Sequence, residues 1–214
     1  MSLPKQRNYE YGYEIAYKLA CEQAKIGDID KLCLSSGARY QVTGSQKIII
    51  LTYLNRSYQI TFPDIDISLI DSEQEVPIRD KILIVHYLTS AKGTPLSHKL
   101  IAYKELPGGS SYFPTFAKRA IKPLLDHFSK EPHLLQGVAQ KIGGNKAEYG
   151  DVAVTINAFS YVPITFVLWR GDEEFAPEGS ILFDSTISDY LSTEDIIVVC
   201  ETITWSLVKL SKEG

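Results

Sequence analysis

Two apolar runs between residues 150 and 169 constrain this chain more than any other stretch. Every second residue of Val152–Ile156 is a branched apolar residue, which is the period-two pattern of a β-strand. The run Ile164–Leu168 repeats the pattern, and the short connection at residues 159–161 predicts a β-hairpin. Because both faces of this pair are largely apolar, we expect it to be central, with other elements packed on each side.

A second group of strands is expected near the N-terminus. Residues 38–62 carry two turn candidates, Gly44-Ser45 and Asn55-Arg56, between strand-like stretches. This arrangement predicts a three-stranded meander. The acidic segment 64–75 that follows has only a weak pattern, so it is expected to be a loop or an edge strand.

Helical periodicity predicts the remaining elements. Apolar residues at helical spacing mark helices at residues 9–25, 113–128 and 132–142, and a last helix that opens at Ser192-Thr193-Glu194-Asp195 with a capping-box-like spacing. Pro123 should kink or split the second of these helices. The run Ile82–Val85 fits a buried helix or a buried strand equally well, and residues 100–106 read as a strand.

These elements predict one α+β domain over residues 4–212. Its mixed or antiparallel sheet would join the N-terminal meander to the central hairpin, and several helices would pack on that sheet. A chain of 214 residues with 44% hydrophobic residues is long and apolar enough to bury such a core.

Composition excludes several classes of function. The net charge of −4, with no run of basic residues, argues against nucleic-acid binding. No apolar run approaches the roughly 18–20 residues that a membrane span needs. The N-terminus lacks the apolar core of a signal peptide, so a cytoplasmic location is expected. The cysteines Cys21, Cys33 and Cys200 are scattered, which is typical neither of a disulfide framework nor of a metal motif.

Three stretches together resemble a known family. They are His86-Tyr87-Leu88 with Gly93, the run YKELPGGSSYFPTF at residues 103–116, and the segment from Gly150-Asp151 to Leu182-Phe183-Asp184. Their order and spacing are similar to those of the prokaryotic family called domain of unknown function 3786. The resemblance implies no established activity. Some members carry an iron–sulfur domain in front of this one, which hints at anaerobic redox or corrinoid metabolism, although this chain has no such segment.

A glycine-rich turn is the first candidate site. Glu105 and the pair Gly108-Gly109 lie between an expected strand and an expected helix, and Tyr112 follows in the first turn. Free amides at such a helix start could bind an anion. The alternative is a plain tight turn in which Ser110 or Ser111 caps the helix, because the spacing matches no known phosphate loop.

An acidic loop is the second candidate. Asp172, Glu173, Glu174 and Glu178 surround one loop, and Asp184 follows the next apolar run. These carboxylates could hold a hard cation or divide into a general acid and a general base. The alternative is a solvated loop, since no EF-hand pattern is present. No metal site is assigned.

His86, in an apolar stretch, is either a hydrogen-bonded core residue or a member of the site. The expected ligand-binding residues are His86, Glu105, Gly108, Gly109, Tyr112, Asp172, Glu174 and Asp184. The leading interpretation is an accessory protein that binds an unknown small molecule or partner protein, with no cofactor identified. The alternative is a hydrolase or transferase that uses the carboxylates, with or without a divalent cation.

Glu105 and Asp184 are further expected to lie close together. Each stands where an apolar run gives way to a turn, and strand ends that meet along one rim of a sheet commonly form a pocket.

Overall fold

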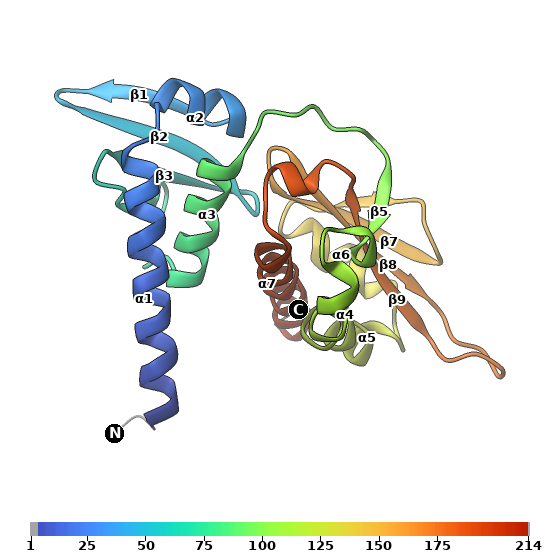
Figure 1. Cartoon of the computed structure of the whole chain (residues 1–214). Helices are drawn as coiled ribbons and strands as arrows, with labels where there is room; N and C mark the ends of the chain where they lie inside the picture. The colour runs from blue at the N-terminus through green and yellow to red at the C-terminus, as the bar shows by residue number, and fades with distance from the viewer. Residues whose placement is uncertain (1–3, 214) are drawn as a thin grey trace. The chain divides into compact units, whose positions relative to one another are not determined.

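The computed structural model describes the backbone of residues 4–213 and the side chains of residues 11–213. The chain divides between Thr94 and Pro95 into two compact units, each with its own sheet (Figure 1). That residues 4–212 form one cooperative domain stays a prediction. A single calorimetric unfolding transition would support it, and two separate transitions would contradict it.

The N-terminal unit combines three helices with a four-stranded antiparallel sheet. Its elements are α1 (Pro4–Lys25), α2 (Ile29–Ser36), β1 (Arg39–Thr43), β2 (Gln46–Tyr53), β3 (Arg56–Phe62), β4 (Ile67–Leu69) and α3 (Ile78–Ser90). The strands follow in the order β1-β2-β3-β4, so the predicted meander is confirmed and the segment after it supplies an edge strand. The run Ile82–Val85 is helical and buried.

Alternation along β2 and β3 builds the core of this unit. Ile49 pairs with Ile60 and Leu51 pairs with Tyr58, so all four side chains share one face of the sheet, and all four are buried. Helix α1 packs along α3, and α2 packs against α3 and β1. Sequence periodicity missed α2, which is only two turns long.

The C-terminal unit holds a five-stranded antiparallel sheet in the order β5-β9-β8-β7-β6. Its elements are β5 (Leu100–Ala102), the 3₁₀ turn η1 (Tyr103–Glu105), α4 (Gly109–Phe116), the π-helical turn η2 (Ala117–Ile121), α5 (Lys122–Phe128), α6 (Leu134–Gln140), β6 (Asn145–Ala147), β7 (Val152–Phe159), β8 (Val162–Trp169), β9 (Glu178–Asp184), the 3₁₀ turn η3 (Ile187–Asp189) and α7 (Thr193–Lys212). Helix α5 packs on β9, α6 packs on β7, and α7 packs against both helices.

The predicted central hairpin is confirmed. Strands β7 and β8 pair in antiparallel register, with Ile156 opposite Ile164, and β8 lies at the centre of the sheet. Most residues of both strands are buried, as expected for a pair that is apolar on both faces. The last helix begins as predicted, because Ser192 caps it by accepting a hydrogen bond from the amide of Asp195 (3.1 Å).

Three expectations need correction. The meander and the hairpin do not share a sheet, because the edge beside β9 is taken by β5 rather than by a strand of the N-terminal unit. The strand expected at residues 100–106 ends at Ala102. There the chain turns, since the Leu106 amide donates to the Tyr103 carbonyl (3.2 Å). The helix expected at 113–128 is split near Pro123, as predicted, but it begins earlier, at Gly109, and the split contains a π-helical turn.

Candidate functional site

The two units divide the residues expected to bind a ligand. His86 lies in α3 of the N-terminal unit, half-buried, and the other seven lie in the C-terminal unit. Whether these residues bind a ligand stays a prediction. The surroundings of each, however, show what its side chain already does in the fold.

Asp184 is a structural clamp at the end of β9. The residue is only 3% exposed, and its carboxylate accepts five hydrogen bonds. The donors are the Ser97 amide (3.1 Å) and hydroxyl (2.8 Å), the His98 amide (2.7 Å), and the Thr186 amide (3.0 Å) and hydroxyl (2.8 Å). Burial by itself would raise the pKa of Asp184, but the bonds from Thr186 and Ser97 outweigh it and hold the pKa at about 2. The carboxylate is therefore ionised, and both of its oxygens accept hydrogen bonds.

Glu105 has a similar local role at the other end of β5. Its carboxylate accepts a hydrogen bond from the amide of Ala102 (2.7 Å), where β5 ends and the 3₁₀ turn begins. Asp184 pairs with Leu100 and binds the residues that precede β5. The two carboxylates thus stabilise opposite ends of one three-residue strand, and no donor residue is shared between them.

The glycine-rich turn is held by its own backbone. The amide of Gly109 donates to the Leu106 carbonyl (2.8 Å), and those of Ser111 and Tyr112 donate to the Gly108 carbonyl (3.1 and 3.3 Å). Anion binding at these amides is therefore not supported, because their donors are occupied. Gly109 is required for packing, since a Cβ there would lie 2.0 Å from the Tyr103 carbonyl oxygen.

The acidic loop between β8 and β9 is solvent-exposed. Within it, one oxygen of Asp172 accepts hydrogen bonds from the amides of Glu174 (2.8 Å) and Phe175 (2.7 Å), and these bonds, led by that from Phe175, lower the pKa of Asp172. In the part of the chain that the structure describes, no three His, Cys, Asp or Glu side chains gather in a way that could hold a metal ion.

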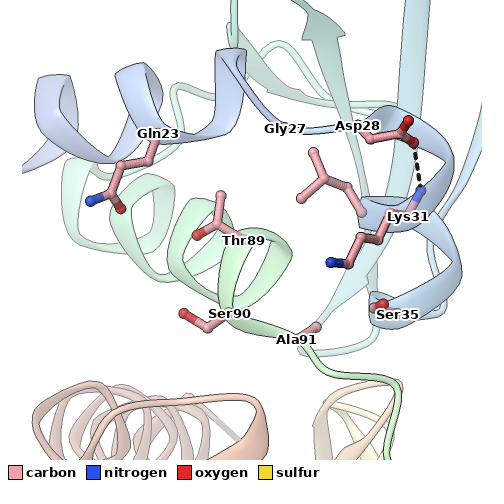
Figure 2. A pocket seen from close by; sticks show the side chains of 9 residues that line it. Gln23, Gly27, Asp28, Lys31, Ser35, Thr89, Ser90 and Ala91 are labelled. Atoms are coloured by element: carbon pink, nitrogen blue, oxygen red, sulfur yellow. Dashed lines mark hydrogen bonds between the residues drawn. The ribbon is translucent and has the colours of Figure 1, made fainter.

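A pocket that the sequence did not indicate lies in the N-terminal unit (Figure 2). It has a volume of about 470 Å³, within the roughly 300–1,000 Å³ of small-molecule sites. Helix α1 contributes Gln23, α2 contributes Lys31 and Ser35, and the end of α3 contributes Thr89 and Ser90. Three helix ends therefore converge on one opening.

Local packing fixes the shape of this pocket. The hydroxyl of Tyr87, fully buried in α3, donates to the Ser36 carbonyl at the end of α2 (2.7 Å). Gly27 suits the tight connection from α1 to α2, because a Cβ there would lie 3.2 Å from the backbone carbonyl oxygen of Ala24. Asp28 then caps α2 by accepting from the Lys31 amide (3.0 Å), the bond drawn in Figure 2.

The pocket offers polar groups that the fold does not use. Figure 2 shows Lys31 extending from α2 toward the side formed by Thr89 and Ser90. Among the described residues, no hydrogen bond or ion pair occupies the side chains of Gln23, Lys31, Ser35 or Ser90. The Thr89 hydroxyl donates to the Val85 carbonyl (2.9 Å) and leaves its oxygen as an acceptor. One cation, the Asp28 carboxylate that caps α2, and several neutral polar groups thus face the same space.

Sequence patterns could have given one clue to this pocket. Gly27 is typical of the end of one helix, and Asp28 is typical of the N-cap of the next. The pair therefore predicts a sharp turn between two helices that are neighbours in the sequence. Periodicity could not show that the end of α3, some sixty residues further on, closes the same opening.

Across residues 4–213, no helix combines the length and apolarity needed to cross a membrane. No curated protein and no solved structure matches the chain significantly. A family model described as domain of unknown function, DUF3786, matches residues 28–205. This match spans both units, all of α2 and α3, and most of α7. The resemblance expected from the three sequence stretches is confirmed, and the chain belongs to the DUF3786 family.

Proposed function

We propose that this protein is a binding protein for a small, polar, negatively charged molecule, which it holds in the pocket between α1, α2 and α3. The observation that carries the proposal is the set of unengaged polar side chains around the pocket, with Lys31 as its cation. A carboxylate or phosphate on the ligand would pair with Lys31. Its neutral polar groups would bond with Gln23, Ser35 and Ser90.

The lining also limits the kind of ligand. The pocket is bounded by hydroxyls, an amide, one ammonium and the Asp28 carboxylate, and Leu32 and Ala91 give it a smaller apolar part. A ligand of moderate size with several hydroxyl or carbonyl groups fits this chemistry better than a flat aromatic one. Because the pocket is open to solvent, salt screens its charges, so we expect the affinity for an anionic ligand to fall as the ionic strength rises.

A thermal-shift screen tests the proposal. Small sugar phosphates, hydroxy acids, nucleotides and corrinoids are added to the full chain, and the unfolding midpoint is measured. A ligand that binds only the folded state stabilises it by about 2.7 kcal/mol at a concentration of 100 Kd. We expect hits among the small anionic compounds, followed by calorimetric titration to obtain the affinity.

Two matched variants assign each hit to the pocket. Lys31→Met should weaken binding of an anionic hit at least tenfold, whereas Lys18→Met, an exposed lysine of α1 outside the pocket, should leave the affinity unchanged. If both variants bind equally well, the ligand lies elsewhere. If no compound shifts the midpoint, the proposed small-molecule function is wrong.

A hydrolase or transferase that uses the predicted carboxylates would have to work without Asp184. Both oxygens of Asp184 are engaged in the clamp, and 3% exposure leaves no room for a substrate. Nothing in the surroundings of Asp172 or Glu174 favours catalysis over solvation. We therefore favour binding over catalysis.

The proposal includes the expected cellular setting. A cytoplasmic location is supported by three unpaired, buried cysteines, Cys21, Cys33 and Cys200, which suit a reducing compartment. The link to anaerobic iron–sulfur or corrinoid metabolism has only the family resemblance as support. The corrinoids in the screen test this link directly, because a corrinoid that gives no midpoint shift is not the ligand.

A further inference from the structure

A second concave surface, independent of the pocket above, lies on the C-terminal unit. It is a groove of about 390 Å³ between α5 with its preceding π turn and α7, and we call it the α5–α7 groove. Its apolar lining residues are Pro123, Trp205 and Val208, and Trp205 is 53% exposed although it is a large aromatic residue. An exposed tryptophan in an apolar depression is typical of a protein–protein contact.

The rim of the groove is basic. Three lysines line it, Lys118, Lys122 and Lys212. Lys122 is neutralised by Asp126 of the same rim, with Nζ 2.6 Å from the carboxylate. No ion pair among the described residues engages Lys118 or Lys212. The groove therefore presents two uncompensated positive charges beside an exposed aromatic ring, which suits an acidic segment with an apolar anchor.

The same unit carries a segment of that chemistry. The loop between β8 and β9 contains three carboxylates, on Asp172, Glu173 and Glu174, beside Phe175, whose side chain is 70% exposed, and Glu178 adds a fourth at the start of β9. Figure 1 shows the hairpin of β8 and β9 projecting beyond the helices of its own unit. The loop thus offers both an aromatic anchor and negative charge.

The loop is also shaped in advance for binding. The amide of Asp172 donates to the Phe175 carbonyl (2.9 Å), and the Asp172 carboxylate accepts from the amides of Glu174 and Phe175. Gly171 allows the two ends of the loop to approach each other closely, because a Cβ at this position would lie 2.7 Å from Pro177. A loop already ordered in this way loses little conformational entropy on binding.

We propose that the β8–β9 loop of one copy docks into the α5–α7 groove of a second copy, with Phe175 against Trp205 and the loop carboxylates beside Lys118 and Lys212. Each copy carries both surfaces. Two copies can therefore exchange loops and close a two-fold dimer with two identical contacts. The aromatic pair supplies apolar contact, and the charges fix the orientation of the loop and speed association.

Sedimentation of the full chain tests this inference. At low ionic strength we expect a concentration-dependent monomer–dimer equilibrium. It should weaken at high salt, because the screening length falls from about 10 Å at 0.1 M to about 3 Å at 1 M. A chain that stays monomeric at all concentrations in low salt would overturn the proposal.

Charge reversal identifies the two surfaces. A groove variant (Lys118→Glu with Lys212→Glu) and a loop variant (Glu173→Lys with Glu174→Lys) should each lose the dimer. Their equimolar mixture should recover it. In the mixture, the acidic loop of the groove variant meets the basic groove of the loop variant, and the basic loop of the loop variant meets the acidic groove of the groove variant. Recovery on mixing also shows that both variants are folded. A control with Lys141→Glu and Lys146→Glu, exposed lysines outside the groove, should stay dimeric. A dimer that survives either surface variant contradicts the proposed contact.

A peptide spanning residues 170–179 separates self-association from binding of another protein. In a Trp169→Phe background, Trp205 is the remaining tryptophan and reports on the groove. The peptide should change its fluorescence and dissociate the dimer, whereas the same peptide with its four acidic residues changed to amides should do neither. Peptide binding to a chain that never dimerises would overturn the second-copy proposal and point to an acidic segment of another protein.

Discussion

One carboxylate oxygen of Asp184 accepts hydrogen bonds from both the amide (3.1 Å) and the hydroxyl (2.8 Å) of Ser97, a residue 87 positions earlier in the chain. This contact joins the segment that enters the C-terminal unit to the end of β9. It explains why an acidic residue lies beneath the surface directly after the apolar residues Ile181–Phe183.

Removal of this carboxylate should destabilise the C-terminal unit. Asp184→Ala leaves the amides of Ser97, His98 and Thr186 without their acceptor, and each unsatisfied buried donor costs about 1–3 kcal/mol. We expect a loss of at least about 3 kcal/mol in the free energy of unfolding, measured by urea denaturation. Asp172→Ala, which removes an exposed carboxylate from the acidic loop, serves as the control and should change stability little. Equal losses of stability in the two variants would contradict the stabilising role of the Asp184 carboxylate.

The same carboxylate should make stability depend on acid pH. The pKa of Asp184 is lowered from 3.8 to about 2 in the folded chain, so the folded state favours the ionised form. Its contribution to stability is complete above about pH 4 and is lost as the pH falls toward 2. The difference in unfolding free energy between the natural chain and Asp184→Asn should therefore shrink over this interval. A difference that stays constant with pH would show that the charge of Asp184 does not matter.

The hydroxyl of Tyr87 should support the pocket of the N-terminal unit. Tyr87→Phe removes the buried hydrogen bond to the Ser36 carbonyl and should lower the free energy of unfolding by about 1–3 kcal/mol. Because this bond ties α2 to α3, any ligand that binds the pocket should also bind this variant more weakly. Tyr11→Phe, which changes an exposed tyrosine, should alter neither quantity. A fully stable Tyr87→Phe variant would contradict the structural role of the bond.

Two glycines in the C-terminal unit should respond to alanine in opposite directions. Gly109→Ala places a Cβ 2.0 Å from the Tyr103 carbonyl oxygen, and such overpacking costs about 1–3 kcal/mol or more. Gly137 lies in α6 with nothing within 4 Å of the added Cβ, so Gly137→Ala should stabilise by about 0.5–1 kcal/mol. Chemical denaturation of both variants checks the sign of each change. If Gly109→Ala leaves the free energy of unfolding unchanged, the close approach of residue 109 to the Tyr103 carbonyl is not required for stability.

Local sequence patterns determined most of the secondary structure. Alternation in β7 and β8 predicted the central hairpin, turn residues predicted the meander, and Ser192 predicted the start of α7. These signals are local, since each depends on residues within one or two turns of the chain. The family assignment followed from the same kind of information, the order and spacing of short motifs.

Tertiary structure decided what local patterns could not contain. The choice of β5 as the partner of β9, the clamp at Asp184 and the pocket between α1, α2 and α3 all join residues far apart in sequence. The acidic residue type does not show by itself whether a side chain is exposed to solvent, as Asp172 is, or is buried and accepts five hydrogen bonds, as Asp184 is. Burial and the donors within reach separate the two, and both arise only when distant segments pack together.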